Sequence, residues 1–132
     1  MSLRSAGVAF GIAALVLGSA ASSASADTAS HSACFLTTNW DGWKSPDPST
    51  ILVRVQMHRV FRLELAHPST QLNDPSVHLL NQVRGSAWIC APIDLDLSVV
   101  DDRGRMREPL FVKGMSELTP AEVKAIPAKY RP

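Results

Sequence analysis

Two carboxylates stand close together in the segment DLDLSVV, where Asp94 and Asp96 are separated by one residue. The alternation of apolar and polar residues predicts a strand with both carboxylates on its outward face. Such a pair can act as general acid and base. A turn at 101–104 returns the chain, however, and places Arg105 and Arg107 across from that face. Opposite charges on neighbouring strands commonly form a solvated ladder, and we favour this interpretation over a hydrolase site.

Motifs for nucleophilic catalysis or metal binding are missing from the sequence after the N-terminal apolar segment. There is no G-x-S-x-G and no S-x-x-K, and the aspartates at 94–102 lack the spacing and the distal glutamate of a calcium loop. The four histidines are scattered: His31, His58, His67 and His78. We interpret His67 and His78 as surface or boundary residues. The sequence predicts no catalytic residue, no metal site and no cofactor.

The stretch NWDGWKSPDPST places Trp40 and Trp43 on either side of Asp41-Gly42. A two-residue hairpin turn would bring the two rings face to face. We prefer a first strand that bends at Gly42 with both rings turned toward the core, because a small β-domain needs aromatic bulk inside. If the rings are exposed instead, Trp40 and Trp43 form a partner-binding platform for sugar rings or for an apolar protein patch.

The first 26 residues have the pattern of a secretory signal peptide. Arg4 supplies the positive charge, residues 6–18 are apolar but too short to cross a bilayer, and small residues precede a cleavage site near Ala26. The alternative is an uncleaved membrane anchor. We therefore predict a periplasmic or secreted protein that is not stably inserted in a membrane after cleavage.

The predicted export of the chain bears on its two cysteines, Cys34 and Cys90. An even number of cysteines in an exported chain indicates a disulfide, which for a loop of this length contributes about 4 kcal/mol to stability. The alternative is two free buried thiols.

The charge balance argues against two classes of partner. The full chain has 13 Lys and Arg against 12 Asp and Glu, and loss of Arg4 with the signal peptide makes the net charge zero. Proteins that bind nucleic acids or anionic membranes usually carry a basic excess. We predict no nucleic-acid partner.

The pattern beyond Cys34 is mainly that of strands. Residues 50–57 and 60–66 alternate clearly and are separated by only two residues, which predicts a hairpin. The segment SAWIC predicts a short buried strand, and 105–115 a final strand in which Pro109 requires a bulge or an edge position.

Two helices are predicted among these strands. Asn73 or Asp74 can cap the first, with Pro75 at its first position and Gly85 at its end. The second begins at Thr119 with a capping box and is short. The resulting order predicts a mainly β (α+β) fold: a small antiparallel five- to six-stranded OB-like barrel or rolled sheet, with one helix between strands three and four and a short C-terminal helix.

The domain boundaries follow from these patterns. Residues 27–33 form a flexible leader, 34–126 a single disulfide-closed β-rich domain and 127–132 a loose tail, in which Lys129, Tyr130 and Arg131 could dock on a partner.

An ordered series of motifs resembles a known family. Cys34-Phe35, N-x-x-G-aromatic, TILVRV, RVFRLEL, WIC followed by an aspartate, and LTPAEV occur in this order. The series resembles the exported bacterial family catalogued as domain of unknown function 6491, over about Cys34 to Val123. The resemblance implies an exported, periplasmic protein and supplies no catalytic residues.

The cysteines depart from that family, whose members often carry four. The additional pair would lie after the third strand and in the last strand, where this chain reads LAHPSTQL and MREPLFV. Their joint absence implies that they pair with each other, which leaves Cys34 bonded to Cys90.

These patterns lead to a prediction of function. We expect a non-enzymatic interaction or structural module of the cell envelope, with an envelope protein as partner. The alternative is an inhibitor or accessory of an envelope or peptidoglycan enzyme, and a hydrolase using Asp94 and Asp96 is less favoured.

Overall fold

The computed structural model describes residues 34–132. The predicted signal peptide, its cleavage site near Ala26 and the leader 27–33 lie outside the described residues.

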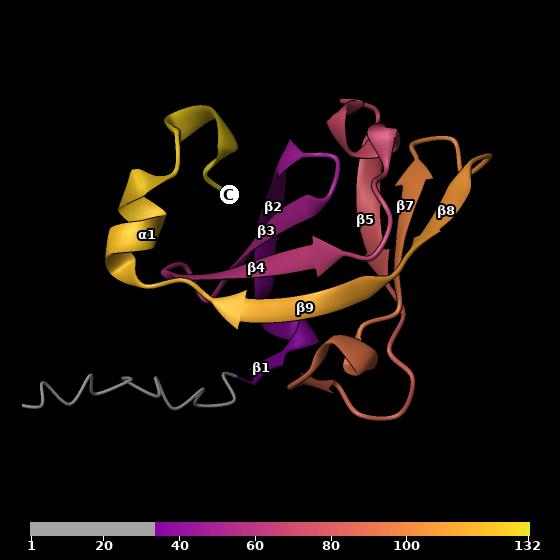
Figure 1. Ribbon diagram of the computed structural model, residues 1–132. Helices are drawn as coiled ribbons and strands as arrows, with labels where there is room; N and C mark the ends of the chain where they lie inside the picture. Colours follow the sequence, from indigo (N-terminus) through magenta and orange to yellow (C-terminus); the bar gives the residue numbers. More distant parts are fainter. Residues whose placement is uncertain (1–33) are drawn as a thin grey trace, which may run out of the picture.

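The described chain is mainly antiparallel β, with nine strands in three sheets and one α-helix (Figure 1). The four-stranded sheet has the order β2-β3-β4-β9. Its strands are β2 (Trp40–Asp47), β3 (Thr50–Val55), β4 (Arg59–Leu65) and β9 (Val112–Glu117). The three-stranded sheet has the order β5-β7-β8. Its strands are β5 (Val77–Asn81), β7 (Leu97–Asp101) and β8 (Arg107–Leu110). A two-stranded sheet joins β1 (Phe35–Leu36) to β6 (Trp88–Ile89).

Strong alternation produces β3 and β4, and both predicted strands are confirmed. Ile51, Val53, Phe61 and Leu63 are almost completely buried. The predicted two-residue connection is wrong, because β3 ends at Val55 and pairs there with Arg59. The turn is therefore 56–58.

The predicted helix at 73–85 is absent. The chain forms a 3-10 turn, η2 (Thr70–Asn73), and then the strand β5. Asp74 stabilises a turn in place of the expected helix start: its Oδ1 accepts hydrogen bonds from the backbone N–H and the hydroxyl of Ser76. Turns and helix starts use the same Asp-Pro signals. Pairing with β7 satisfies the backbone of β5 and decides between the two structures.

The predicted final strand is split between two sheets. β8 pairs with β7, the chain bends at Phe111, and β9 pairs with β4. Figure 1 shows this run passing from the three-stranded sheet into the four-stranded one. Pro109 lies on β8, an edge strand of its sheet, as predicted. The two main sheets are thus joined by continuous chain on this side.

The interior consists of two apolar clusters. The larger lies between the sheets and includes Phe35 and Phe61, whose ring centroids are 4.7 Å apart. The smaller lies between the four-stranded sheet and α1 (Pro120–Ala125), where Leu52, Val60 and Leu118 are buried. The capping box predicted for α1 is present, since the Thr119 hydroxyl accepts from the Glu122 N–H and the Glu122 carboxylate accepts from the Thr119 N–H.

The last residues differ from the expected loose tail. They form a 3-10 turn, η4 (Ala128–Tyr130), and the Arg131 guanidinium donates to the carbonyls of Lys124 and Ile126. These bonds satisfy carbonyl groups at the end of α1. The tail is therefore held against the helix, and Figure 1 shows the C-terminus returning toward β2.

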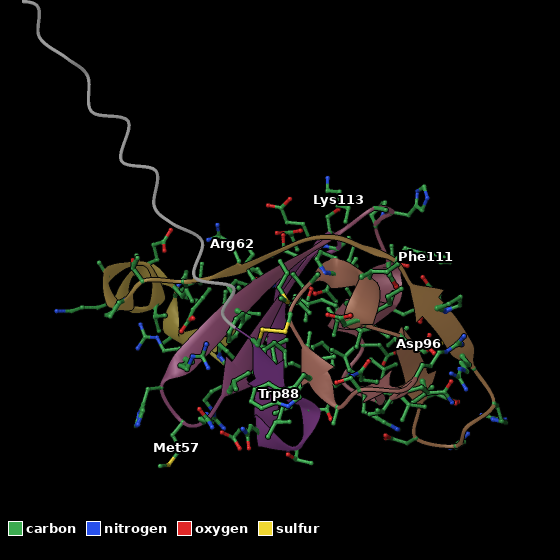
Figure 2. The ribbon with its side chains drawn as sticks, turned by 90° about the horizontal axis from the view of Figure 1, so that it is seen from below. Met57, Arg62, Trp88, Asp96, Phe111 and Lys113 are labelled. Carbon is green, nitrogen blue, oxygen red and sulfur yellow. A yellow bond between two sulfur atoms is a disulfide. The ribbon has the colours of Figure 1, made fainter. Side chains whose placement is uncertain are left out.

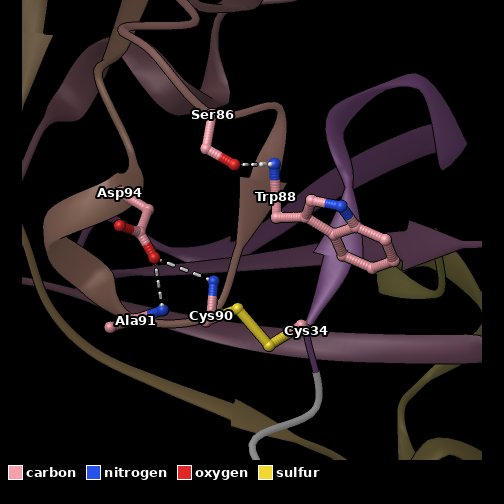
Figure 3. Close-up of a disulfide and its surroundings, with 6 residues drawn as sticks. All are labelled: Cys34, Ser86, Trp88, Cys90, Ala91 and Asp94. Carbon is pink, nitrogen blue, oxygen red and sulfur yellow. Dashed lines mark hydrogen bonds between the residues drawn. A yellow bond between two sulfur atoms is a disulfide. The ribbon is translucent and has the colours of Figure 1, made fainter.

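The predicted disulfide is confirmed between Cys34 and Cys90, with 4.2 Å between their Cα atoms (Figure 3). It links the residue before β1 to the residue after β6. Trp88 beside it is half exposed, so the buried strand predicted for SAWIC is only partly buried.

Candidate functional site

The clearest candidate site lies where the two main sheets fail to join. β2 and β5 are the end strands of their sheets, and no backbone hydrogen bond connects them. We call the boundary between Trp40–Asp47 and Val77–Asn81 the open seam. The five ladders between β2 and β5 are all antiparallel, and β8 continues into β9 in the same direction. It follows that β2 and β5 run in opposite directions.

Both ends of the open seam are closed. At one end, the Cys34–Cys90 disulfide and a 2.9 Å bond from Thr37 N–H to the Ala87 carbonyl join the chain before β2 to the chain after β5. At the other end, Ser69 N–H donates to the Pro48 carbonyl at 2.8 Å. The seam is open only along its middle.

Two hollows lie along the seam. The larger, which we call the cleft, has a volume of about 470 Å³. Its lining includes Trp43, Lys44, Asn73, Asp74, Lys129 and Tyr130. The smaller hollow has a volume of about 200 Å³ and is lined by Thr37, Trp40, Leu79 and Asn81. The cleft thus brings the predicted Trp43 together with residues of the C-terminal tail.

A β-bulge explains how both tryptophans reach the seam. Trp40 pairs with Val55, and Gly42 pairs with Arg54. Two positions of β2 therefore correspond to one position of β3, which makes Asp41 an extra residue. In a regular strand, residues three apart point to opposite faces, and one inserted residue restores the same face. Trp40 and Trp43 are half-buried against the main core, as preferred from the sequence, yet each also lines a hollow.

The cleft carries more positive than negative charge. Lys44 and Lys129 take part in no ion pair among residues 34–132. The one carboxylate in the lining is Asp74, whose pKa is lowered by the hydrogen bonds from the backbone and then the side chain of Ser76. The Lys129 ammonium lies 4.5 Å from the centroid of the Tyr130 ring. An anionic group is the complementary ligand for these two ammonium groups.

Asn81 is a polar residue of the smaller hollow that sequence reasoning missed. Its Oδ1 accepts from the Asp96 N–H at 3.0 Å, whereas its buried Nδ2 has no partner among the described residues. Burial of an unpaired donor is costly. The sequence would indicate Asn81 as a residue of this hollow only if 77–81 were assigned as a strand, because the expected helix gave its side chain no particular role.

The Asp94 and Asp96 prediction needs correction, because neither residue lies on a strand. Asp94 belongs to the 3-10 turn η3 (Pro92–Asp94), and its Oδ2 accepts from the N–H groups of Cys90 and Ala91 at 2.9 Å (Figure 3). Asp96 precedes β7 and accepts from Arg84 Nε. Pro92 and these backbone bonds form a turn, so the strand begins at Leu97 rather than at Asp94 and the two carboxylates do not share a strand face.

The predicted ladder is also absent. Arg105 lies 4.0 Å from Asp101, within its own turn, and Arg107 Nε donates to the Ser98 hydroxyl at 3.3 Å. The Asp101 pKa is lowered chiefly by its bond from the Met106 N–H. Asp101, like Asp94, therefore stabilises a turn by accepting hydrogen bonds from backbone N–H groups.

The scattered histidines show no site in the part of the chain that the structure describes. His67 and His78 are exposed, as predicted, and His78 Nδ1 lies 3.6 Å from an Asp102 oxygen. Residues 34–132 contain no group of three histidine, cysteine or acidic side chains that could hold a metal.

The tip of the β3–β4 hairpin is a second unusual feature. Gln56 and Met57 have φ angles of 51° and 63°, which side chains rarely adopt. His58 N–H donates to the Gln56 carbonyl at 2.7 Å, so the chain reverses within a tight turn at these two residues. The bulge residue Asp41 holds this turn by accepting from the Met57 N–H at 2.9 Å. Figure 2 shows Met57 at the edge of the molecule, where its side chain is 76% exposed.

The comparisons with known proteins add no assignment. No family model matches the chain, and no curated protein and no solved structure is significantly similar to it. Within residues 34–132, no helix has the length and apolar character needed to cross a membrane. The family resemblance stays a prediction.

Proposed function

We propose that this protein is an exported, non-enzymatic interaction module of the cell envelope and that the cleft is its partner-binding surface. The observation that carries the proposal is the open seam. Within residues 34–132, its two strand edges have no strand partner, and they border a hollow with two aromatic rings and two lysines that form no ion pair. Ligand sites are usually concave, and the mixed polar and apolar lining of this cleft suits a polar ligand.

The roles of the carboxylates support a binding function over a hydrolytic one. Asp94 holds two backbone N–H groups, and Asp96 is bonded to Arg84. A catalytic pair requires two carboxylates that face one substrate and differ in pKa, and these two are committed to separate local structures.

The compartment and the fold family are part of the same proposal. The Cys34–Cys90 disulfide is compatible with an oxidising compartment, which supports export to the periplasm with cleavage near Ala26. The open seam between β2 and β5 supports the rolled-sheet form of the predicted architecture more than a closed OB-like barrel. We retain membership of the family catalogued as domain of unknown function 6491 as a proposal.

A crosslinked pull-down from the envelope fraction tests the binding surface. The bait is the oxidised chain 27–132, beside a Lys44→Glu/Lys129→Glu variant that reverses the charge of the cleft. The matched control is Lys113→Glu/Lys124→Glu, which makes the same charge change outside the cleft. We expect a saturable partner that is retained by the control and lost by the cleft variant. Equal retention by both variants, or no specific partner, contradicts the proposal.

The hairpin tip favours a second candidate function, the inhibitor or accessory of an envelope enzyme. Backbone strain tends to be kept at functional sites, and a protruding methionine adapts to an apolar pocket. A peptidoglycan hydrolase assay with micromolar protein tests this candidate. A change in hydrolase activity that Met57→Gly abolishes and Ile93→Gly leaves intact supports it, since Ile93 is also highly exposed. No change in activity removes it.

A further inference from the structure

We infer that the open seam binds an extended polypeptide segment, which pairs as an added strand with an edge of β2 or β5 and directs an acidic side chain toward Lys44 and Lys129. This inference rests on the proposed function and names the class of ligand for the same cleft.

The unpaired edges supply the backbone recognition. Among residues 34–132, β2 pairs only with β3 and β5 only with β7, so each has one edge without a strand partner in this part of the chain. An extended peptide that adds to such an edge gains main-chain hydrogen bonds that do not depend on its sequence. Because β2 and β5 run in opposite directions, a segment lying between them would be antiparallel to one and parallel to the other.

The side chains along the seam supply selectivity. Alternate residues of an added strand point to the same side, so one set would face the seam and its two hollows. The unpaired Nδ2 of Asn81 is a donor for a peptide carbonyl at the smaller hollow. Lys44 and Lys129 at the cleft complement a carboxylate. Asp74 also lines the cleft, and its pKa is lowered by the hydrogen bonds that its Oδ1 accepts from Ser76. The two lysines still outnumber this one carboxylate in the lining.

The aromatic residues favour a peptide over a glycan. Sugar rings stack on open aromatic faces, as on an exposed tryptophan platform. Trp40 and Trp43 instead pack against the main core, and the Lys129 ammonium lies over the Tyr130 ring. Besides these partly buried rings, the seam exposes strand edge, amide and ammonium groups, which match the chemistry of an acidic extended peptide.

The experiment begins with selection from a phage-displayed library of random octapeptides, with the oxidised chain 27–132 as target and the Lys44→Glu/Lys129→Glu variant for counter-selection. We expect enriched sequences that combine β-branched residues with an acidic residue. Recovery that does not differ between the target and the variant overturns the inference.

The best synthetic octapeptide is then tested against analogues and a sugar. N-methylation of alternate backbone amides should weaken binding at least tenfold in one of the two alternating sets, and replacing the acidic residue with its amide should weaken it several-fold. In ¹⁵N spectra, shifts and slowed amide exchange should be confined to β2, β5 and the cleft. Insensitivity to N-methylation in both sets, or shifts elsewhere, overturns strand addition.

Tetra-N-acetylglucosamine serves as the probe for the alternative ligand class. If this sugar shifts the cleft residues and the selected peptide does not, the peptide inference fails while the proposed binding function stands. A pull-down without any cleft-dependent partner would instead remove the proposed function itself.

Discussion

The two main sheets meet along two boundaries that are built differently. On one side, β8 continues through Phe111 into β9, so covalent chain and the β4–β9 and β7–β8 ladders join the sheets. On the other, β2 and β5 approach with no ladder, and side chains such as Trp40 and Leu79 line a hollow between them. The comparison shows that a domain of this size can leave one boundary between its sheets without a ladder if the ends of that boundary are fixed.

The largest effect is expected from removing the link at the end of the open seam. Cys34 and Cys90 are 56 positions apart, and in the chain-entropy model a disulfide over this loop contributes about 4 kcal/mol. We expect Cys34→Ser/Cys90→Ser to lower the free energy of unfolding by about this amount, as measured by urea denaturation. Tryptophan emission should also move to longer wavelength before global unfolding, because Trp40 and Trp43 lie along the seam. A single cooperative transition with unchanged midpoint would show that the seam does not depend on the disulfide.

A pair of leucine substitutions compares the open seam with the interior of the four-stranded sheet. Leu63 is completely buried in β4 between β3 and β9, whereas Leu79 of β5 is only half-buried at the open seam. We expect Leu63→Ala to cost about 3 kcal/mol and Leu79→Ala about 1 kcal/mol, because the cost of a truncation increases with the cavity it leaves. Equal losses in urea denaturation would mean that the open seam is packed as tightly as the interior.

Relief of strain at the hairpin tip should act in the opposite direction. Met57 has a φ of 63°, which glycine adopts freely. Since the left-handed conformation costs a side-chain-bearing residue about 1–2 kcal/mol and glycine loses part of this gain to entropy, Met57→Gly should stabilise the fold by about 1 kcal/mol. Thermal denaturation measures the gain. Ile93→Gly, at a position without positive φ, should give none, and a destabilised Met57→Gly would show that the tip is not strained.

The smallest effect is expected at the ion pair beside α1. Arg59 Nε and a terminal nitrogen donate to the two Glu117 oxygens at 2.8 and 2.9 Å, and this bond lowers the Glu117 pKa. We expect Glu117→Gln to cost about 0.5 kcal/mol at neutral pH. The cost should disappear in acid, because a group with a lowered folded pKa stabilises the fold above its unfolded pKa, near 4.5, and loses that contribution as it protonates.

Urea denaturation at pH 7 and pH 3 checks this dependence. Glu64→Gln is the control, since Glu64 is exposed and has no ion pair among residues 34–132. A cost of Glu117→Gln that is the same at both pH values would show that the pair is not the source of the effect.

The candidate site was only partly predictable. Trp43 and the tail residues Lys129 and Tyr130 were singled out separately, but nothing in their spacing indicated that they line one cleft. That meeting depends on the Asp41 bulge and on the path of the chain after α1. Asp94 and Asp96 attracted attention through spacing alone, and their backbone bonds could not be read from alternation.

Local sequence determined the elements whose signals have one solution. The unbroken alternation of β3 and β4 and the capping box at Thr119 left few alternatives, because side-chain period and cap chemistry act over short distances. The disulfide is a long-range link, and it was predictable because two cysteines allow only one pairing. Only the tertiary structure decided residues 73–85 and the split of the last strand at Phe111. Apolar residues at 77–81 satisfy either a helix or a strand, and the free edge of β7 is what made the strand the lower-energy choice.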